Sequence, residues 1–119
     1  MKNTLLDKGI IFPSGEINKD KINLVAGAIT QPFAEMVWIT TGGDMETVNR
    51  LTDIIVTMNT PTDREKLFKI IKMLYGLMGL RFSEEAEPMN ADPDVLDYFL
   101  FSFTADFGEI IKDYIAEAQ

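Results

Sequence analysis

The chain has 119 residues, the length of one ordinary domain, and 46% of them are hydrophobic, so it can bury a core. It carries 11 basic and 19 acidic side chains, a formal charge of −8, with no cysteine and no histidine. These two absences exclude disulfides, cysteine nucleophiles, histidine general bases and zinc sites built from thiolates or imidazoles. We therefore expect a single folded domain over residues 1–119 whose chemistry does not depend on those groups.

The acidic charge is concentrated toward the C-terminal end. Residues 1–60 hold 5 basic and 7 acidic side chains, residues 61–82 hold 5 and 2, and residues 83–119 hold 1 and 10. An acidic segment repels nucleic acid and anionic membranes and attracts basic partners. Direct binding to nucleic acid is therefore not expected, and the simplest interpretation of the charge is that it keeps the protein soluble.

The first 17 residues predict an extended N-terminal arm. Ile10, Ile11 and Phe12 favour a strand, and Pro13-Ser14-Gly15 predicts a turn, which leaves open a hairpin, a segment packed on the body, or an arm that docks onto a neighbouring subunit. No apolar run near Met1 has the form of a signal peptide. Polar and charged residues interrupt the apolar stretches 22–41 and 67–80, so neither predicts a membrane span, and the lack of cysteines favours a cytoplasmic location.

Two helices are predicted in the first half of the chain after this arm. The first begins near Asn18, ends at Gly42-Gly43, and is expected to kink or divide at Pro32. Its apolar residues recur at helical spacing: Ile22, Val25, Ile29, Phe33 and Met36. The second begins after Asp44 and has a narrow apolar stripe, formed by Val48, Leu51, Ile54, Ile55 and Met58.

Two further helices are predicted in the second half. Thr62 to Glu65 has the pattern of a capping box, and a helix with a wide apolar arc should follow it to about Gly79 or Leu80. Residues 83–91 predict an acidic linker. Asp92 then caps the last helix, Pro93 takes its first position, and the pattern continues to Ala118. The short joints favour antiparallel neighbours, and the fold class is all-α, a compact bundle of about four helices.

The last helix is apolar on two sides, which is unusual for a surface helix. Its main seam contains Leu96, Phe99, Leu100, Phe103, Phe107, Ile110, Ile111 and Tyr114. A second apolar side indicates either a sandwiched helix or a surface that binds a partner. The candidate interface residues on this side are Tyr98, Phe101, Ala105, Gly108 and Ile115, and two more candidates from other helices are Trp38 and Met73.

Acidic clusters and loops offer little catalytic or metal-binding chemistry. Counting from Asp92, an EF-hand would need its glycine where Asp97 stands and its last carboxylate where Phe103 stands, so the pattern fails. The carboxylates Glu84, Glu85 and Glu87 fit a solvated linker, and residues 40–44 lack the lysine of a phosphate-binding loop. Because no histidine can activate the few serines, we expect no enzyme, no metal and no cofactor.

Three functions remain as hypotheses. The first is a protein-binding module, such as an adaptor, assembly factor or inhibitor, whose interface is the last helix. The second is a nucleic-acid mimic whose carboxylates replace phosphates and block a DNA- or RNA-binding protein. The third is a small structural component of a phage-like or other large assembly, in which residues 1–17 would be the docking arm. Independently of these hypotheses, the basic residues of the third helix could meet the acidic last helix, either within one molecule or between copies. No motif in the sequence identifies a family.

Overall fold

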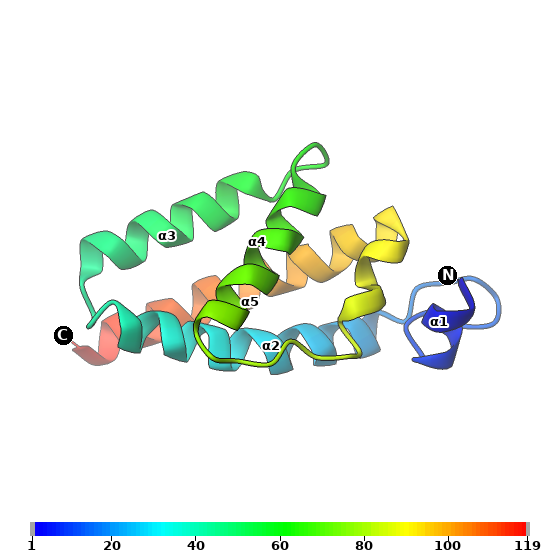
Figure 1. The fold of residues 1–119 in the computed structure, drawn as a ribbon, viewed down its shortest axis with the longest axis horizontal. Coiled ribbons are helices and arrows are strands. Elements are labelled where there is room, and N and C mark those ends of the chain that lie inside the picture. The colour runs from blue at the N-terminus through cyan, green and yellow to red at the C-terminus, as the bar shows by residue number, and fades with distance from the viewer. Residues whose placement is uncertain (1, 119) are drawn as a thin grey trace.

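Two long helices, α2 (Lys19–Thr40) and α5 (Pro93–Ala118), form the most extensive contact in the molecule (Figure 1). The computed structural model describes residues 2–118. The other helices are α1 (Lys2–Asp7), α3 (Met45–Met58) and α4 (Arg64–Leu77), and a short 3-10 helix, η1 (Glu87–Ala91), precedes α5. Between residues 2 and 118 there is no β-structure beyond a single bridge, so the predicted all-α bundle with four main helices is confirmed.

The helix α5 runs in the same direction as α2, a pair to which the prediction from the short joints at 42–43 and 59–62 does not apply. Lys19 at the start of α2 lies 5.6 Å from the ring centroid of Tyr98, and near the other end the ring centroids of Trp38 and Tyr114 are 5.6 Å apart. The reason is visible in Figure 1, where the chain after α4 runs back along the bundle before α5 begins. Across the joint at 42–43 the predicted antiparallel arrangement is present, since α3 runs in the opposite direction to α2, and α3 contacts α5 and α4 (Figure 1).

Three of the predicted helix starts are confirmed by their caps. The side chain of Asn18 accepts a hydrogen bond from the backbone N–H of Lys21 at 3.3 Å, and Asp44 does the same for Thr47 at 3.3 Å. Asp92 accepts from the N–H of Val95 at 3.3 Å, with a proline in the first helical position. Pro32 lies inside α2, which continues through it as one helix rather than as two.

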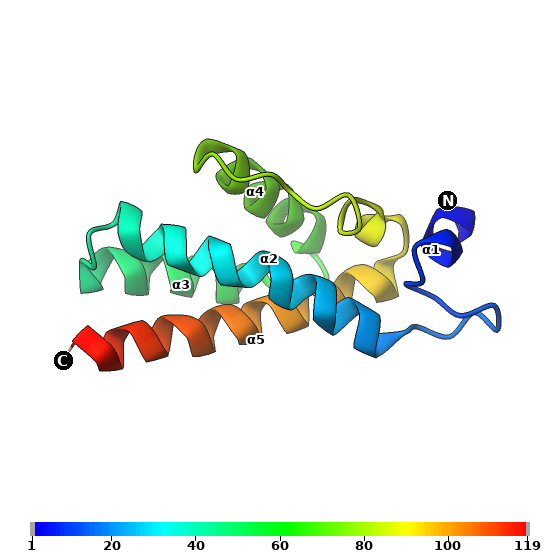
Figure 2. The ribbon, with the colours of Figure 1, turned by 90° about the horizontal axis from the view of Figure 1, so that it is seen from below.

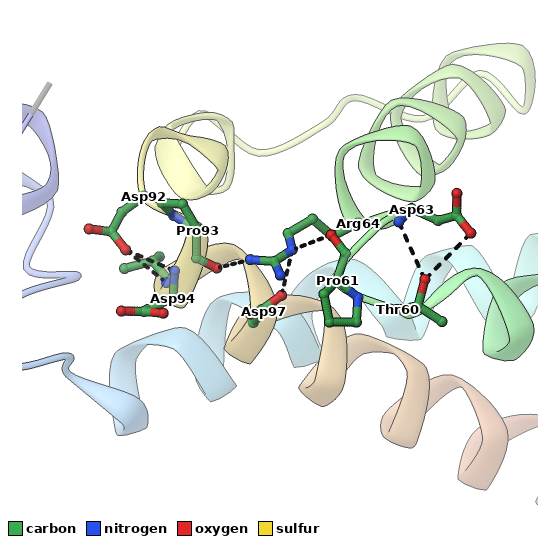
Figure 3. A network of polar contacts seen from close by, with 9 residues as sticks. Thr60, Pro61, Asp63, Arg64, Asp92, Pro93, Asp94 and Asp97 are labelled. Carbon is green, nitrogen blue, oxygen red and sulfur yellow. Dashed lines mark hydrogen bonds and ion pairs between the residues drawn. The ribbon is translucent and has the colours of Figure 1, made fainter.

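The predicted limits of α4 are wrong at both ends. Thr62 does not cap the helix, because α4 begins two residues later and Thr60 instead accepts the N–H of Asp63 at 3.3 Å (Figure 3). At the other end Gly79 has a left-handed φ of +76°, and the N–H of Leu80 donates to the carbonyl of Tyr75 at 2.9 Å. This pairing is a Schellman turn, and it ends the helix at Leu77.

The N-terminal segment is only partly extended. Residues 2–7 form α1, which was predicted as part of an extended arm, and its Leu5 is buried. The chain then makes an antiparallel bridge between Ile11 and Ile17 around the predicted turn. Both parts lie at one end of the bundle, and α1 contacts η1 of the same chain (Figure 1). The segment therefore packs on its own domain, because Leu5 and Ile10 complete the core at that end.

The centre of the core is aromatic. The ring centroid of Phe33 on α2 lies 5.4 Å from the centroids of both Phe103 and Phe107 on α5, in edge-to-face geometry. It lies 5.9 Å from the ring centroid of Tyr75 on α4. Phe68 of α4 meets Phe99 of α5 at 5.9 Å. The predicted seam of α5 is therefore confirmed as the side that faces the other helices.

The acidic segment at 83–91 is more than a linker. Ala86 and Met89 are buried in the core, and η1 occupies most of the segment. Two of its carboxylates are tied to other elements, since Glu85 pairs with Lys21 at 3.1 Å and Glu87 pairs with Lys72 at 2.7 Å. These contacts hold the returning chain against α2 and α4.

Among residues 2–118, one helix, α2, is long and apolar enough to cross a membrane by length and composition alone, with a mean hydropathy of 1.2 over its best window. Core helices of soluble proteins have the same property. Here α2 contributes eight buried residues to the bundle, namely Ile22, Val25, Ala26, Ile29, Thr30, Phe33, Ala34 and Val37.

Candidate protein-binding surface on α5

The outer side of α5 carries a large exposed aromatic residue in the middle of the helix. Phe101 is 65% exposed, although Leu100 and Ser102 beside it are buried. Successive helical residues are about 100° apart, so the seam residues Phe99 and Phe103 turn to the opposite side of the helix. Phe101 therefore projects from a rigid, well-packed helix and contributes nothing large to the core. Burial by a partner would remove this apolar surface from water.

Two shallow hollows flank Phe101, and each has a volume of about 400 Å³. Tyr98 and Phe101 line both of them. The first hollow is completed by the loop after α3 and by the N-terminal segment, and its other residues are Ile17, Asn59, Thr60, Pro61, Asp94 and Asp97. The second lies between α5 and α2, and its other residues are Asn23, Ser102, Ala105 and Asp106. A pair of hollows around one projecting ring suits side chains that would be inserted by a partner.

The loop that closes the first hollow is fixed by polar contacts. The side-chain amide of Asn59 donates to the hydroxyl of Thr104 on α5 at 3.1 Å. Figure 3 shows Arg64 reaching from α4 to α5, where its Nε lies 2.9 Å from a carboxylate oxygen of Asp97 and its terminal nitrogen donates to the carbonyl of Pro93 at 3.3 Å. The walls of this hollow are thus held in place without a ligand.

Three aspartates give the surface its negative charge. Asp97 is partly neutralised by Arg64, whereas Asp94 and Asp106 form no ion pair within residues 2–118. Burial raises the pKa of the Asp106 carboxyl above its ordinary value, since this side chain lies close to Gly27 of α2. Lys19 also adjoins the surface, because it lies over the ring of Tyr98. The surface therefore combines apolar area with carboxylates that have few cations near them.

Some of the predicted interface residues lie together and others do not. Tyr98, Phe101 and Ala105 share the outer side of α5 and line the hollows, and Gly108 lies one turn further along the helix. Trp38 and Ile115 are half-buried against the core, and the Trp38 ring stacks on Tyr114 with an interplanar angle of 18°. This stacking explains Trp38 by packing within the chain.

Met73 belongs to a different surface. It lies on α4 and is 56% exposed, as its position on the polar side of that helix predicts. One turn later Leu77 is 76% exposed, although the wide apolar arc of α4 assigns it to the core. Leu77 follows Met73 by four residues and therefore lies on the same side of the helix, and this spacing could have predicted its exposure. Sequence patterns also gave no indication of Asn59, Pro61 or Ile17, which the fold brings to the first hollow from distant segments.

Of the carboxylates considered for metal binding, those of Asp92 and Asp97 are engaged in other contacts. One oxygen of Asp92 accepts the backbone N–H groups of Asp94 and Val95, and Asp97 pairs with Arg64. Residues 2–118 hold no group of three or more acidic side chains placed to bind a metal ion. Comparison of the chain with protein-family models, with curated proteins and with solved structures finds no match, so the surface itself is the basis for proposing a function.

Proposed function

We propose that this protein is a protein-binding module whose interface is the outer side of α5 around Phe101. The observation that carries the proposal is the 65% exposure of Phe101 between two hollows on a helix whose other side is fully packed. Aromatic anchors at the centre of a surface supply much of the affinity of protein interfaces. The rigid setting supports the same role, because an anchor on a helix loses little conformational entropy on binding.

The alternative of a nucleic-acid mimic has weaker support. A mimic needs carboxylates that are free and follow one another on an exposed surface, whereas four of those in residues 83–119 pair with cations of the chain, namely Glu84, Glu85, Glu87 and Asp97. The remaining carboxylates on the outer side of α5 are separated by Phe101 and Ala105. A surface of mixed apolar and acidic character is better suited to bind an ordinary protein segment than the phosphate-binding groove of a DNA- or RNA-binding protein.

Affinity copurification from the native host tests the proposal. The tagged chain is compared with Phe101→Ser and with Ile39→Ser, which removes a side chain of similar exposure, 60%, from α2. We expect a stoichiometric partner that the wild type and the Ile39 variant retain at high salt and that the Phe101 variant loses. Loss of the partner from all three at high salt would favour charge mimicry, since screened charge pairs weaken and apolar contacts do not. A partner retained equally by all three would place the interface elsewhere.

A further inference from the structure

The outer side of α4 combines two cations with two apolar side chains. Lys66, Lys69, Met73 and Leu77 are all exposed, and they recur at intervals of three or four residues, so they share one side of the helix. Neither lysine forms an ion pair within residues 2–118, unlike Arg64 and Lys72 of the same helix. We call these four residues the α4 face.

The outer side of α5 repeats this spacing with the opposite charge. Asp94, Asp97, Phe101 and Ala105 are separated by three, four and four residues, as are the members of the α4 face. When Phe101 is set opposite Met73 with the helices parallel, Asp97 falls opposite Lys69 and Asp94 falls opposite Lys66. Leu77 then falls opposite Ala105, where a small side chain leaves room for a large one. We call these four residues the α5 face.

From this position-by-position complementarity we infer that the occupant of the α5 face is the α4 face of a second copy of this chain. The inference rests on the proposed function, because it names the partner of the same surface. Each contact would bury Met73 against Phe101 and Leu77 against Ala105. It would place Asp94, which forms no ion pair within residues 2–118, near Lys66, and Asp97, which also pairs with Arg64 of its own chain, near Lys69. Opposite charges at matched positions fix the register of paired helices, whereas apolar anchors supply the affinity.

Gly108 lies one turn beyond the α5 face. Gly108 lies inside the helix with a helical φ, and a Cβ added to it would meet nothing within 4 Å. No contact within the chain therefore requires glycine there, although glycine costs a helix about 1 kcal/mol relative to alanine. In the register that sets Phe101 opposite Met73, α4 ends at Leu77 opposite Ala105, so Gly108 lies beyond the paired residues and takes no part in the contact.

The two faces are separate surfaces of one molecule. The inner sides of α4 and α5 meet through Phe68 and Phe99, and Figure 2 shows the two helices at opposite edges of the bundle. Arg64 at the start of α4 reaches Asp97 of the α5 face, but the four residues of the α4 face make no such contact within residues 2–118. A contact between different faces leaves one free face on each copy. The contact is therefore heterologous, and it produces chains or closed rings of copies rather than only a symmetric dimer.

The mass of the purified chain in solution gives the first test. Sedimentation is measured from about 1 μM to about 1 mM, which covers weak to moderate affinities. We expect the average mass to rise with concentration above the monomer mass of 13.4 kDa. A mass that stays at 13.4 kDa at every concentration would overturn the inference. This measurement requires no variant. Capture of a different protein through Phe101 would still leave the proposed function standing in that case.

Two variants, each with one face altered, test which surfaces meet. Asp94→Lys with Phe101→Ser alters the α5 face, and Lys66→Glu with Met73→Ser alters the α4 face. All four side chains are exposed, and circular dichroism checks that each variant keeps the helical fold. We expect each variant alone to remain a monomer, and an equimolar mixture to form a dimer, because one intact face of each kind remains. Association of either variant alone, or a mixture that stays monomeric while the wild type associates, would overturn the inference.

A charge exchange tests the register. Asp94→Lys alone and Lys66→Glu alone should each weaken self-association about tenfold or more, because each change sets like charges opposite each other. The chain carrying both changes should recover most of the lost affinity. If the double variant is weaker than either single variant, these two positions do not face each other and the proposed register is wrong.

Discussion

Phenylalanine has two distinct roles in this chain, and the difference lies in what surrounds each ring. Phe33 is fully buried and lies within 5.9 Å of three other rings, whereas Phe101 is exposed on the other side of α5. The stability of the domain depends on rings of the first kind, because they exclude water from the core. A ring of the second kind is available to another molecule.

The same substitution at these two positions should separate stability from binding. Phe33→Ala leaves a cavity in the aromatic core and should lower the free energy of unfolding by about 3–5 kcal/mol, a large part of the total for a small domain. Phe101→Ala should lower it by less than about 0.5 kcal/mol. Urea unfolding followed by circular dichroism measures both. Equal losses at the two positions would mean that Phe101 is part of the core.

Asp106 makes stability depend on pH in a predictable direction. Its pKa is raised in the folded protein above the ordinary value of 3.8 by burial, so the folded state binds this proton more tightly than the unfolded state does. Stability from this group is therefore present below pH 3.8 and is lost as pH rises through the folded pKa.

The substitution Asp106→Asn should remove this loss. The variant should be more stable than the wild type at neutral pH, and the difference should disappear in acid, where the wild-type carboxyl is protonated. Thermal unfolding at pH 3, 5 and 7 measures the difference, and Asp113→Asn on the exposed part of α5 controls for the loss of one negative charge. A difference that is constant over this pH range would contradict the predicted shift.

At the scale of the helices, caps and turns explain where each helix begins and ends. Sequence signals predicted the caps Asn18, Asp44 and Asp92 correctly, since each is a short polar side chain directly before an apolar repeat. The predicted cap of α4 is wrong, because the helix begins at Arg64 after a turn in which Thr60 accepts the N–H of Asp63, and no side chain within residues 2–118 caps it. The helix α1 was missed because its six residues carry no repeat, and the burial of Leu5 depends on distant parts of the chain.

The cap of α5 should make a measurable contribution to stability. Asp92→Ala removes the side chain that accepts two backbone N–H groups, at 2.9 and 3.3 Å, and should cost about 1 kcal/mol. Glu109→Ala removes an exposed carboxylate from the middle of the same helix and should change stability by less than about 0.5 kcal/mol. Chemical denaturation of both variants makes the comparison. A cost at Asp92 no larger than at Glu109 would mean that the cap does not stabilise α5.

Helical periodicity identified the buried side of each helix more reliably than it identified exposed residues. Ile54 and Leu77 lie on predicted apolar stripes and are nevertheless exposed, because periodicity gives a direction on the helix but not the edge of the neighbouring helix. The projecting Phe101 was predicted as an interface residue from the second apolar side of α5. Its two hollows were not, since residues from the loop after α3 and from α2 complete them.

At the scale of the whole molecule, the net charge of −8 is divided between contacts within the chain and charge left on the surface. Arg64 and Lys72 of α4 pair with Asp97 and Glu87, which joins α4 to the acidic C-terminal third. The cations Lys66 and Lys69 remain on one outer surface, and Asp94 remains on another. The fold thus separates unpaired charges of opposite sign onto two exposed surfaces, each of which also carries apolar side chains.

The most direct test of the central claim is photo-crosslinking in the native host, with a photoreactive phenylalanine in place of Phe101 or, as the control, of Ile39. Both positions are exposed, at 65% and 60%, so they differ mainly in whether they belong to the proposed interface. We predict a discrete crosslinked protein from position 101 and none from position 39, and a product of twice the monomer mass would identify a second copy as the partner. Absence of any product from position 101, or the same products from both positions, would contradict the assignment of the outer side of α5 as the binding surface.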